Sequence, residues 1–359
     1  MTRLSNWENI ADHSTRVVAV LADSTAELDY GTSIPPWPQI IREKMKDRWG
    51  ISGTGFRGNW KSEWSFTSGG DAWTSSTQSD SWSKAPYDGG FIANCHTMLA
   101  NGSTKTATWT KPSWLTQSIT SFKLYVVDGA SSGDFAYRID GGAWTDVSSS
   151  WDQNSSLDVI TIPSAVSSTV QVRGANAVGT AQNIYLVGLE ANTGTGSTLH
   201  DISASAQGLY TTANLTGNAD YLAWIDVIQP DIIIVSFTND LQTSVYNTTT
   251  ITNKLQAIAT RQQPYGYVVP MPFWGQDRYA DGCDDARNTQ LAGIYTSNAT
   301  TNNSEYIDLW ARYGNYAAVN GLGYMQDTLH PSDSGGVEIA KLVWPLLARG
   351  TGNTRVRSS

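Results

Sequence analysis

Two short, wholly apolar runs narrow the folds open to this chain. Residues 17–21 read Val-Val-Ala-Val-Leu and residues 232–235 read Ile-Ile-Ile-Val, with no polar residue that would indicate a solvent-exposed face. A strand with one solvent-facing side alternates apolar and polar residues, whereas an unbroken β-branched run indicates a strand covered on both faces. Such strands belong chiefly to parallel sheets. The runs therefore predict a parallel sheet with helices on both of its faces.

Helical patterns alternate with strand patterns around these runs. Residues 37–49 carry apolar side chains at helical spacing, with prolines near the start and Gly50 after the end. Further helices are predicted over residues 221–228, 250–261, 285–297 and 335–347, and further strands over residues 267–271 and 306–309. The alternation predicts one α/β domain made of residues 1–55 and 196–350, followed by a flexible tail over residues 351–359.

The residues between the two parts of this domain differ from them in amino-acid composition and pattern. Residues 56–195 contain few charges and several short β-rich runs separated by polar turns, including the hairpin-type turn Asp140-Gly141-Gly142. This spacing predicts an inserted antiparallel β-sandwich. The chain has 15 Trp and 16 Tyr, so we consider the insert a candidate carbohydrate-binding module, although most such rings fill cores. The candidate sugar platforms are Trp73, Trp82, Trp109, Trp114, Trp144 and Trp151.

Charge and hydropathy exclude several classes of function. The net charge of −9 argues against a nucleic-acid surface, which needs clustered Lys and Arg. The longest apolar runs are too short to cross a bilayer, so no membrane insertion is expected. The N-terminal residues lack the apolar segment of a signal peptide. No cysteine spacing typical of a metal site occurs, and we expect neither a metal nor an organic cofactor.

The segment Asp327-Thr328-Leu329-His330-Pro331 is the most specific local signal. A carboxylate three residues before an imidazole can meet it within one turn, fix its tautomer and stabilise its charged form, as a general base requires. An Asp-x-x-His pair is weak evidence by itself, because a surface histidine that caps a helix has the same pattern.

Polar residues follow both apolar runs. Ser24 comes just after the first run and Asn239 just after the second, and ligands bind at the carboxyl ends of strands in parallel sheets. A serine there can act as a nucleophile, and an asparagine can donate a hydrogen bond to an oxyanion. The alternative is that Asp23, Ser24 and Asn239 only satisfy backbone groups in turns. Residues 199–206 are a third candidate segment, whose backbone can supply a second donor.

Together these segments resemble the ordered sequence blocks of the SGNH (GDSL-like) hydrolases. Ala22-Asp23-Ser24 is similar to the Gly-Asp-Ser block, residues 237–240 to the Gly-x-Asn-Asp block, and residues 327–331 to the closing Asp-x-x-His block. The resemblance implies a flavodoxin-like three-layer domain interrupted by a jelly-roll-like sandwich. It also implies that Ser24 is the nucleophile, His330 the base and Asp327 its orienting group.

The same resemblance assigns the oxyanion hole to Asn239 and to the backbone N–H groups of Ser24 and Ala206, with Asp23 as a supporting residue. Three positions depart from the family pattern: Ala22 and Phe237 replace glycines, and Ala206 aligns where the family usually has a glycine donor. We expect Phe237, next to Asn239, to narrow the site. We also expect a loop over residues 273–285 to line the entrance with Phe273, Trp274 and Arg278.

The resemblance implies a serine esterase that removes acyl groups, O-acetyl above all, from a cell-surface glycan or other cell-envelope ester. The arrangement is also similar to SGNH-type minor tail proteins of phages. This implies a virion tail or extracellular location, other tail proteins as partners and a homo-oligomer. The alternative is a catalytically inactive adhesin that binds a host glycan. The departures at Ala22 and Phe237 favour the adhesin, and the intact Ser24, Asp327 and His330 favour the enzyme.

Overall fold

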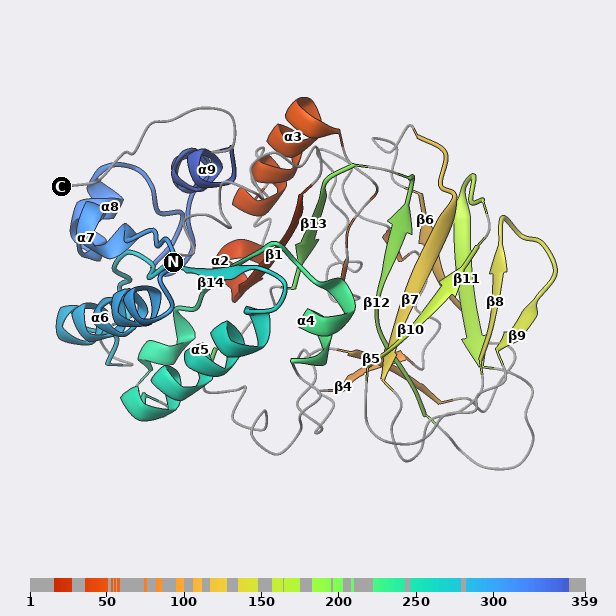
Figure 1. Ribbon diagram of the computed structural model, residues 1–359, viewed down its shortest axis with the longest axis horizontal. Coiled ribbons are helices and arrows are strands. Elements are labelled where there is room, and N and C mark those ends of the chain that lie inside the picture. The colour runs from red at the N-terminus through yellow and green to blue at the C-terminus, as the bar shows by residue number, and fades with distance from the viewer. Residues whose placement is uncertain are drawn as a thin grey trace.

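A computed structural model shows an α/β part and a β-rich part side by side (Figure 1). It describes residues 16–27, 36–50, 53, 55, 57–58, 74–75, 82–85, 95–99, 106–111, 117–127, 135–147, 157–163, 165–174, 183–194, 196–202, 208–209, 222–242, 246–278 and 282–348. Within these ranges, no helix has both the length and the apolar character needed to cross a bilayer.

The centre of the α/β part is a parallel sheet that contains both apolar runs. Its strands lie in the order β13-β1-β14-β15, and each is parallel to its neighbour. Their bounds are β13 (Thr198–Asp201), β1 (Val17–Ala22), β14 (Ile232–Ser236) and β15 (Tyr267–Pro270). The predicted parallel sheet is therefore confirmed, with β1 and β14 as its inner strands.

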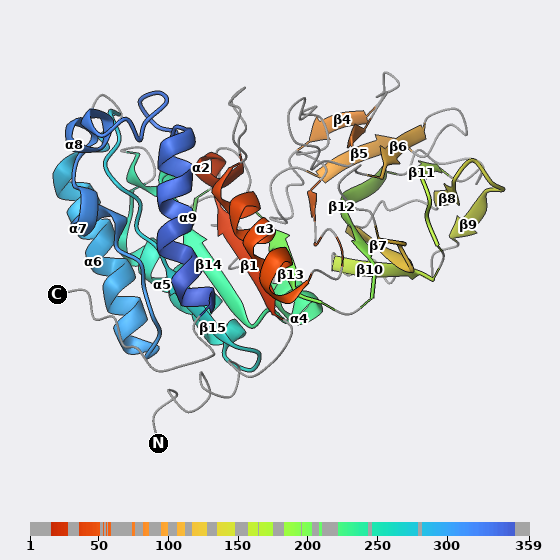
Figure 2. The same ribbon diagram turned by 90° about the horizontal axis from the view of Figure 1, so that it is seen from above.

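Alternate residues of β1 enter two different hydrophobic cores. Val18, Val20 and Ala22 pack on the side of α3 (Trp37–Trp49) and α9 (Asp333–Ala348). Ala19 and Leu21 pack on the opposite side. The helices that cover this opposite side are α4 (Ala223–Ile228), α5 (Thr248–Gln262) and α6 (Asp285–Thr301). Figure 2 shows the sheet between these helix layers, which explains why the run has no polar side.

One predicted strand of this part is wrong. Residues 304–308 form no regular element, and Leu309 begins α7 (Leu309–Tyr313). The Ile307 N–H does donate to the Pro270 carbonyl at the end of β15 (3.1 Å), but the next residue turns the chain. The Asp308 carboxylate accepts from the Ala311 N–H at 2.7 Å and so caps a helix instead. The remaining short helices are α2 (Ser24–Glu27), η3 (Asn239–Leu241) and α8 (Tyr316–Gly321).

The β-rich part consists of two antiparallel layers that enclose a third core. One layer is a five-stranded sheet in the order β3-β6-β11-β8-β9. The other contains β10-β7-β12 with β5 and β4 alongside. Phe122 and Leu124 of one layer meet Phe135 and Val172 of the other in this core. The bounds are β3 (Thr74–Ser75), β4 (Trp82–Ala85), β5 (Cys95–Leu99), β6 (Thr106–Thr110), β7 (Ser121–Val127), β8 (Phe135–Ile139), β9 (Thr145–Val147), β10 (Leu157–Ile162), β11 (Thr169–Gly174) and β12 (Asn183–Asn192).

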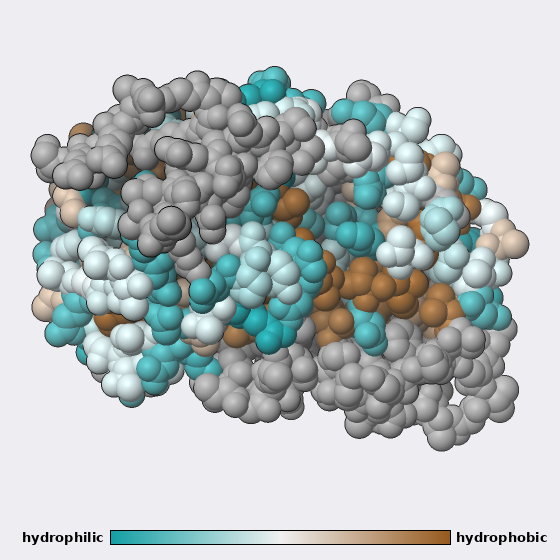
Figure 3. Space-filling view, in the orientation of Figure 1, coloured by the Kyte–Doolittle hydropathy of each residue, from teal (hydrophilic) through white to brown (hydrophobic). Residues whose placement is uncertain are grey.

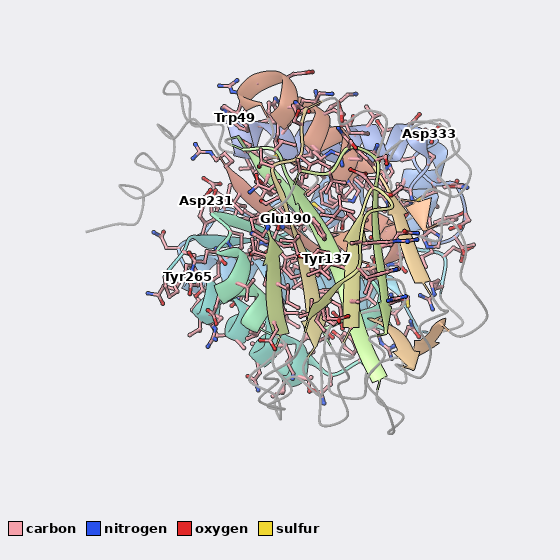
Figure 4. The ribbon with its side chains drawn as sticks, turned by 90° about the vertical axis from the view of Figure 1, so that its right-hand side faces the viewer. Trp49, Tyr137, Glu190, Asp231, Tyr265 and Asp333 are labelled. Atoms are coloured by element: carbon pink, nitrogen blue, oxygen red, sulfur yellow. The ribbon has the colours of Figure 1, made fainter. Side chains whose placement is uncertain are left out.

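Local chemistry supports these layers. Asp140 and Gly141, between β8 and β9, have φ values of 50° and 72°, the left-handed geometry of the tight hairpin turn that the sequence predicts. Glu190 of β12 accepts a hydrogen bond from the Tyr125 hydroxyl of β7 at 2.5 Å, and burial together with this carboxylate raises the pKa of Tyr125. Glu190 and Tyr137 are labelled in Figure 4, which views the molecule from the β-rich side.

The two parts share one sheet, which the sequence did not predict. The two-residue strand β2 (Arg57–Gly58) is antiparallel to β12 and parallel to β13, so a ten-stranded sheet runs through both. Across one face of this sheet, Tyr125 and Leu157 belong to the same apolar cluster as Trp224 of α4. Figure 3 shows apolar surface over β10, beside α4. The boundaries at residues 55 and 195 stay a prediction.

Candidate active site

The candidate residues follow the carboxyl ends of two adjacent strands. Ala22, the last residue of β1, is the register partner of Ser236, the last residue of β14. The segments that begin at Asp23 and Phe237 therefore leave the sheet side by side. Short helices begin at once, α2 at Ser24 and η3 at Asn239. The local sequence thus places a hydroxyl and an amide at one end of the sheet.

His330 joins this end of the sheet from the far end of the chain. Its Nε2 lies 3.0 Å from Ser24 Oγ, although 306 positions separate the two residues. Its Nδ1 lies 2.8 Å from Asp327 Oδ2. Both distances are normal for hydrogen bonds. Two hydrogen bonds therefore link the three side chains that the sequence singled out, in the order hydroxyl, imidazole and carboxylate.

The loop that carries Asp327 and His330 is closed by its own backbone. Asp327 Oδ1 accepts from the N–H groups of Leu329 and His330, each at 2.7 Å, which leaves Oδ2 directed at the imidazole. Pro331 then leads into α9, whose first residue, Asp333, is labelled in Figure 4. Burial raises the pKa of the Asp327 carboxyl, but hydrogen bonds from His330 and Leu329 outweigh burial and hold this pKa below its ordinary value. Asp327 is consequently anionic at neutral pH.

Asp23 connects the serine segment to the asparagine segment. Its carboxylate is fully buried. Oδ1 accepts from the Thr25 N–H and hydroxyl at 3.0 and 2.7 Å. Oδ2 accepts from the Thr238 N–H and hydroxyl, both at 2.6 Å, and from the Asn239 N–H at 3.2 Å. These hydrogen bonds cross-link the two turns, which is the supporting place that the resemblance implies for Asp23.

The Asn239 side chain is held in one orientation. Its carbonyl oxygen accepts from Gln242 Nε2 at 3.1 Å and from Arg278 Nη1 at 3.2 Å. Its amide nitrogen lies 3.4 Å from Asp23 Oδ2. The sequence singled out Arg278 only as a residue at the entrance. Its partner Asn239 lies 39 positions earlier, and no local pattern marks such a pair.

Two expected features of the site entrance are wrong. Phe273 and Trp274 are buried in the core between the sheet and α9, where Trp274 packs against Tyr313 and Tyr324. Phe237 does not narrow the site, because its ring is buried in the core on the opposite side of the sheet. Ala22 is likewise buried. Its methyl group and the Phe237 ring serve packing in the positions where the family pattern has glycines.

Some predicted residues lie outside the described part of the chain. These are the third oxyanion donor, Ala206, and the candidate platforms Trp73, Trp114 and Trp151, and the side chains of Trp82 and Trp109 are not described either. Trp144 is described, and the guanidinium groups of Arg138 and Arg173 lie 4.6 and 4.1 Å from its ring centroid. Among the residues that the structure describes, no group of three or more His, Cys, Asp or Glu side chains is arranged to hold a metal ion.

The parallel sheet and its helix layers match the SGNH hydrolase fold. The solved structure of a peptidoglycan O-acetylesterase is similar over 96% of this chain and 94% of its own, with a TM-score of 0.67 and 14% sequence identity. This likeness establishes the fold of the chain. Because 96% of the chain is covered, the likeness includes most of the β-rich part as well as the α/β part.

Two further solved structures are similar over a smaller part. A lipase/acylhydrolase from Enterococcus faecalis covers 43% of this chain and 77% of its own, at 14% identity and a TM-score of 0.37. An acetyl xylan esterase covers 42% and 80%, at 19% identity and a TM-score of 0.34. No family model matches the sequence, and no curated protein matches it.

Proposed function

We propose that this chain is a carboxylic ester hydrolase of the SGNH type, with Ser24 as nucleophile, His330 as general base and Asp327 as the carboxylate that orients it. The observation that carries the proposal is the 3.0 Å contact between Ser24 Oγ and His330 Nε2. A serine that only satisfied its own turn would not need an imidazole from a distant loop. An imidazole backed by an anionic carboxylate is the group that activates such a hydroxyl.

The reaction follows from these positions. Ser24 Oγ attacks the ester carbonyl carbon while its proton passes to His330 Nε2, and the carbonyl electron pair moves onto oxygen. The Asn239 amide and the Ser24 backbone N–H donate to this oxyanion. When the tetrahedral intermediate collapses, His330 gives the proton to the departing alcohol and an acyl-serine remains. Water then attacks the acyl carbon while His330 takes one of its protons. The bond from this carbon to Ser24 Oγ breaks, His330 returns the proton to Oγ, and the carboxylic acid leaves.

The proposed substrate is an O-acetylated glycan of a cell surface. Support comes from the likeness to a peptidoglycan O-acetylesterase over nearly the whole of both chains. The β-rich part is proposed to bind the glycan, on the basis of the aromatic content of the chain.

We further propose that the enzyme is a homo-oligomeric component of a phage tail that trims cell-envelope esters during adsorption. This rests on the resemblance to phage tail proteins and on the Ser-, Thr- and Asn-rich β-structure. Mass spectrometry of purified virions tests the location, and an absence of this chain from the virions contradicts it.

The enzymatic proposal is tested by comparing wild type with Ser24→Ala on p-nitrophenyl acetate and on O-acetylated peptidoglycan, with acetate release as the readout. Ser236→Ala is the matched control, since Ser236 is a buried serine that ends the neighbouring strand. We expect Ser24→Ala to abolish hydrolysis and Ser236→Ala to retain it. Folded proteins that hydrolyse neither substrate contradict the enzyme and favour the adhesin, whose glycan binding would survive Ser24→Ala.

A further inference from the structure

The orientation of the Asn239 amide is determined by the groups around its oxygen. Arg278 Nη1 and Gln242 Nε2 both point donors at Asn239 Oδ1, at 3.2 and 3.1 Å. An amide oxygen accepts and an amide nitrogen donates, so the opposite rotamer would bring N–H groups against two donors. The amide nitrogen is therefore turned towards Asp23, the residue before Ser24, and lies 3.4 Å from its Oδ2. It carries two hydrogens, so donation to Asp23 does not use its whole capacity.

Arg278 is itself held between the two halves of the site. The Asp277 N–H donates to the Thr328 carbonyl at 2.9 Å, which attaches this segment to the loop that carries Asp327 and His330. The Cys283 N–H donates to the Arg278 carbonyl at 3.1 Å, and the Cys283 side chain is buried. The guanidinium thus reaches Asn239 from a backbone that is anchored on both sides of Arg278.

We propose that Arg278 is a positioning residue of the oxyanion hole, which acts through Asn239. Its hydrogen bond keeps the carboxamide in the rotamer that directs N–H groups towards the reacting ester. A charged donor on the carbonyl oxygen also withdraws electron density from the amide, which makes its N–H groups stronger donors. This inference rests on the proposed esterase activity and adds a residue that the sequence blocks do not contain.

A double-mutant cycle on p-nitrophenyl acetate separates action through Asn239 from direct contact with the ester. The proteins are wild type, Arg278→Met, Asn239→Ala and the double variant. Removal of an oxyanion donor lowers kcat by about 100- to 1,000-fold. We expect Arg278→Met to lower kcat by roughly 10- to 100-fold with KM nearly unchanged, and to cause no further loss when Asn239 is already alanine. Arg278→Lys, which keeps a charged donor, should recover part of kcat.

Arg287→Met is the matched control. Its guanidinium donates to the Leu241 carbonyl of the same short helix at 3.0 Å and lies over the Tyr246 ring, so the variant removes the same charge without touching Asn239. We expect its kcat to equal that of wild type. Losses from Arg278→Met and Asn239→Ala that multiply in the double variant overturn the proposal, and so does an equal loss in Arg287→Met.

An NMR measurement, which does not depend on turnover, tests the role of Arg278 separately from the esterase activity. The Asn239 side-chain N–H signals, assigned in an NMR spectrum by their loss in Asn239→Ala, should move upfield in Arg278→Met and stay in place in Arg287→Met. Unmoved signals in Arg278→Met overturn the positioning role even in an active enzyme. Shifted signals support it even if Ser24→Ala and wild type prove equally inactive, a result that would count against the proposed esterase activity alone.

Discussion

Replacing Asp23 by asparagine tests whether the buried carboxylate holds the two turns together. Three backbone N–H groups, those of Thr25, Thr238 and Asn239, donate to its two oxygens, and two hydroxyls donate as well. An asparagine keeps one oxygen and presents an NH2 group where the other was. The hydroxyls can rotate and accept from this group, but backbone N–H groups cannot. At least one buried backbone donor therefore loses its acceptor in either rotamer of the new amide.

The magnitude follows from this count. A buried donor without an acceptor costs about 1–3 kcal/mol, and the remaining bonds weaken by roughly 1 kcal/mol because their acceptor is no longer charged. We expect Asp23→Asn to lower the free energy of unfolding by about 2–4 kcal/mol. Relief of the cost of burying a charge acts in the opposite direction, but it is small where the donors already match an acceptor-only group.

Urea unfolding at pH 7, followed by tryptophan fluorescence, measures this difference. Asp308→Asn is the control, because Asp308 also accepts a backbone N–H, from Ala311 at 2.7 Å, and asparagine caps helices as well as aspartate does. We expect the control to change the free energy of unfolding by less than about 0.5 kcal/mol. An Asp23→Asn protein as stable as the control would refute the view that donors converge on Asp23 to hold the site.

Two further predictions concern the loop after α8 and the first turn of α9. Asp327→Asn should lower kcat by about 1,000- to 10,000-fold, because a neutral amide no longer stabilises the imidazolium. The lowered pKa of Asp327 means that its carboxylate contributes stability above about pH 4, and that this contribution disappears as the pH falls through the lower folded pKa. The difference in Tm between wild type and Asp327→Asn should therefore shrink as the pH falls below about pH 4, and a difference that does not shrink there contradicts the shift. Gly335→Ala places a methyl group 2.2 Å from the Tyr324 carbonyl oxygen and should lower the free energy of unfolding by about 1–3 kcal/mol. At Gly336 the nearest atom is 3.8 Å from the added methyl group, so Gly336→Ala should be tolerated. Equal values of Tm for the two variants would contradict the steric reasoning.

The central sheet was predictable because a strand that is buried on both faces requires an unbroken run of apolar residues. Val18 and Ala19 enter different cores, so neither position can be polar, and the run that results has few other interpretations. The short segment at residues 306–309 lacked such a run. Its single aspartate reads equally well as a polar strand residue or as a helix cap, and the hydrogen bond to Ala311 decides in favour of the cap.

Ser24, Asp327 and His330 could be proposed from sequence because their neighbours in the chain restrict where they lie. The strand before Ser24 and the three-residue spacing of Asp327 and His330 are local signals. The contact between Arg278 and Asn239 depends on how two loops pack, so only the structure brings it out. The prediction that Phe273 and Trp274 line the entrance was wrong for the same reason. Both side chains are buried, and the local sequence does not distinguish a buried tryptophan from an exposed one.

The two-residue strand β2 determines whether one side of β13 is an open sheet edge. Arg57 of β2 pairs with Asp201 of β13 on the side that faces away from β1, and Gly53 forms a bridge to Asn192 of β12. Gly55 approaches so closely that a Cβ there would lie 2.0 Å from the Leu199 carbonyl oxygen. Excision of the β-rich part together with β2 would leave this side of β13 as a sheet edge that can pair with another chain. We therefore predict that β2 limits self-association of the α/β part through this edge.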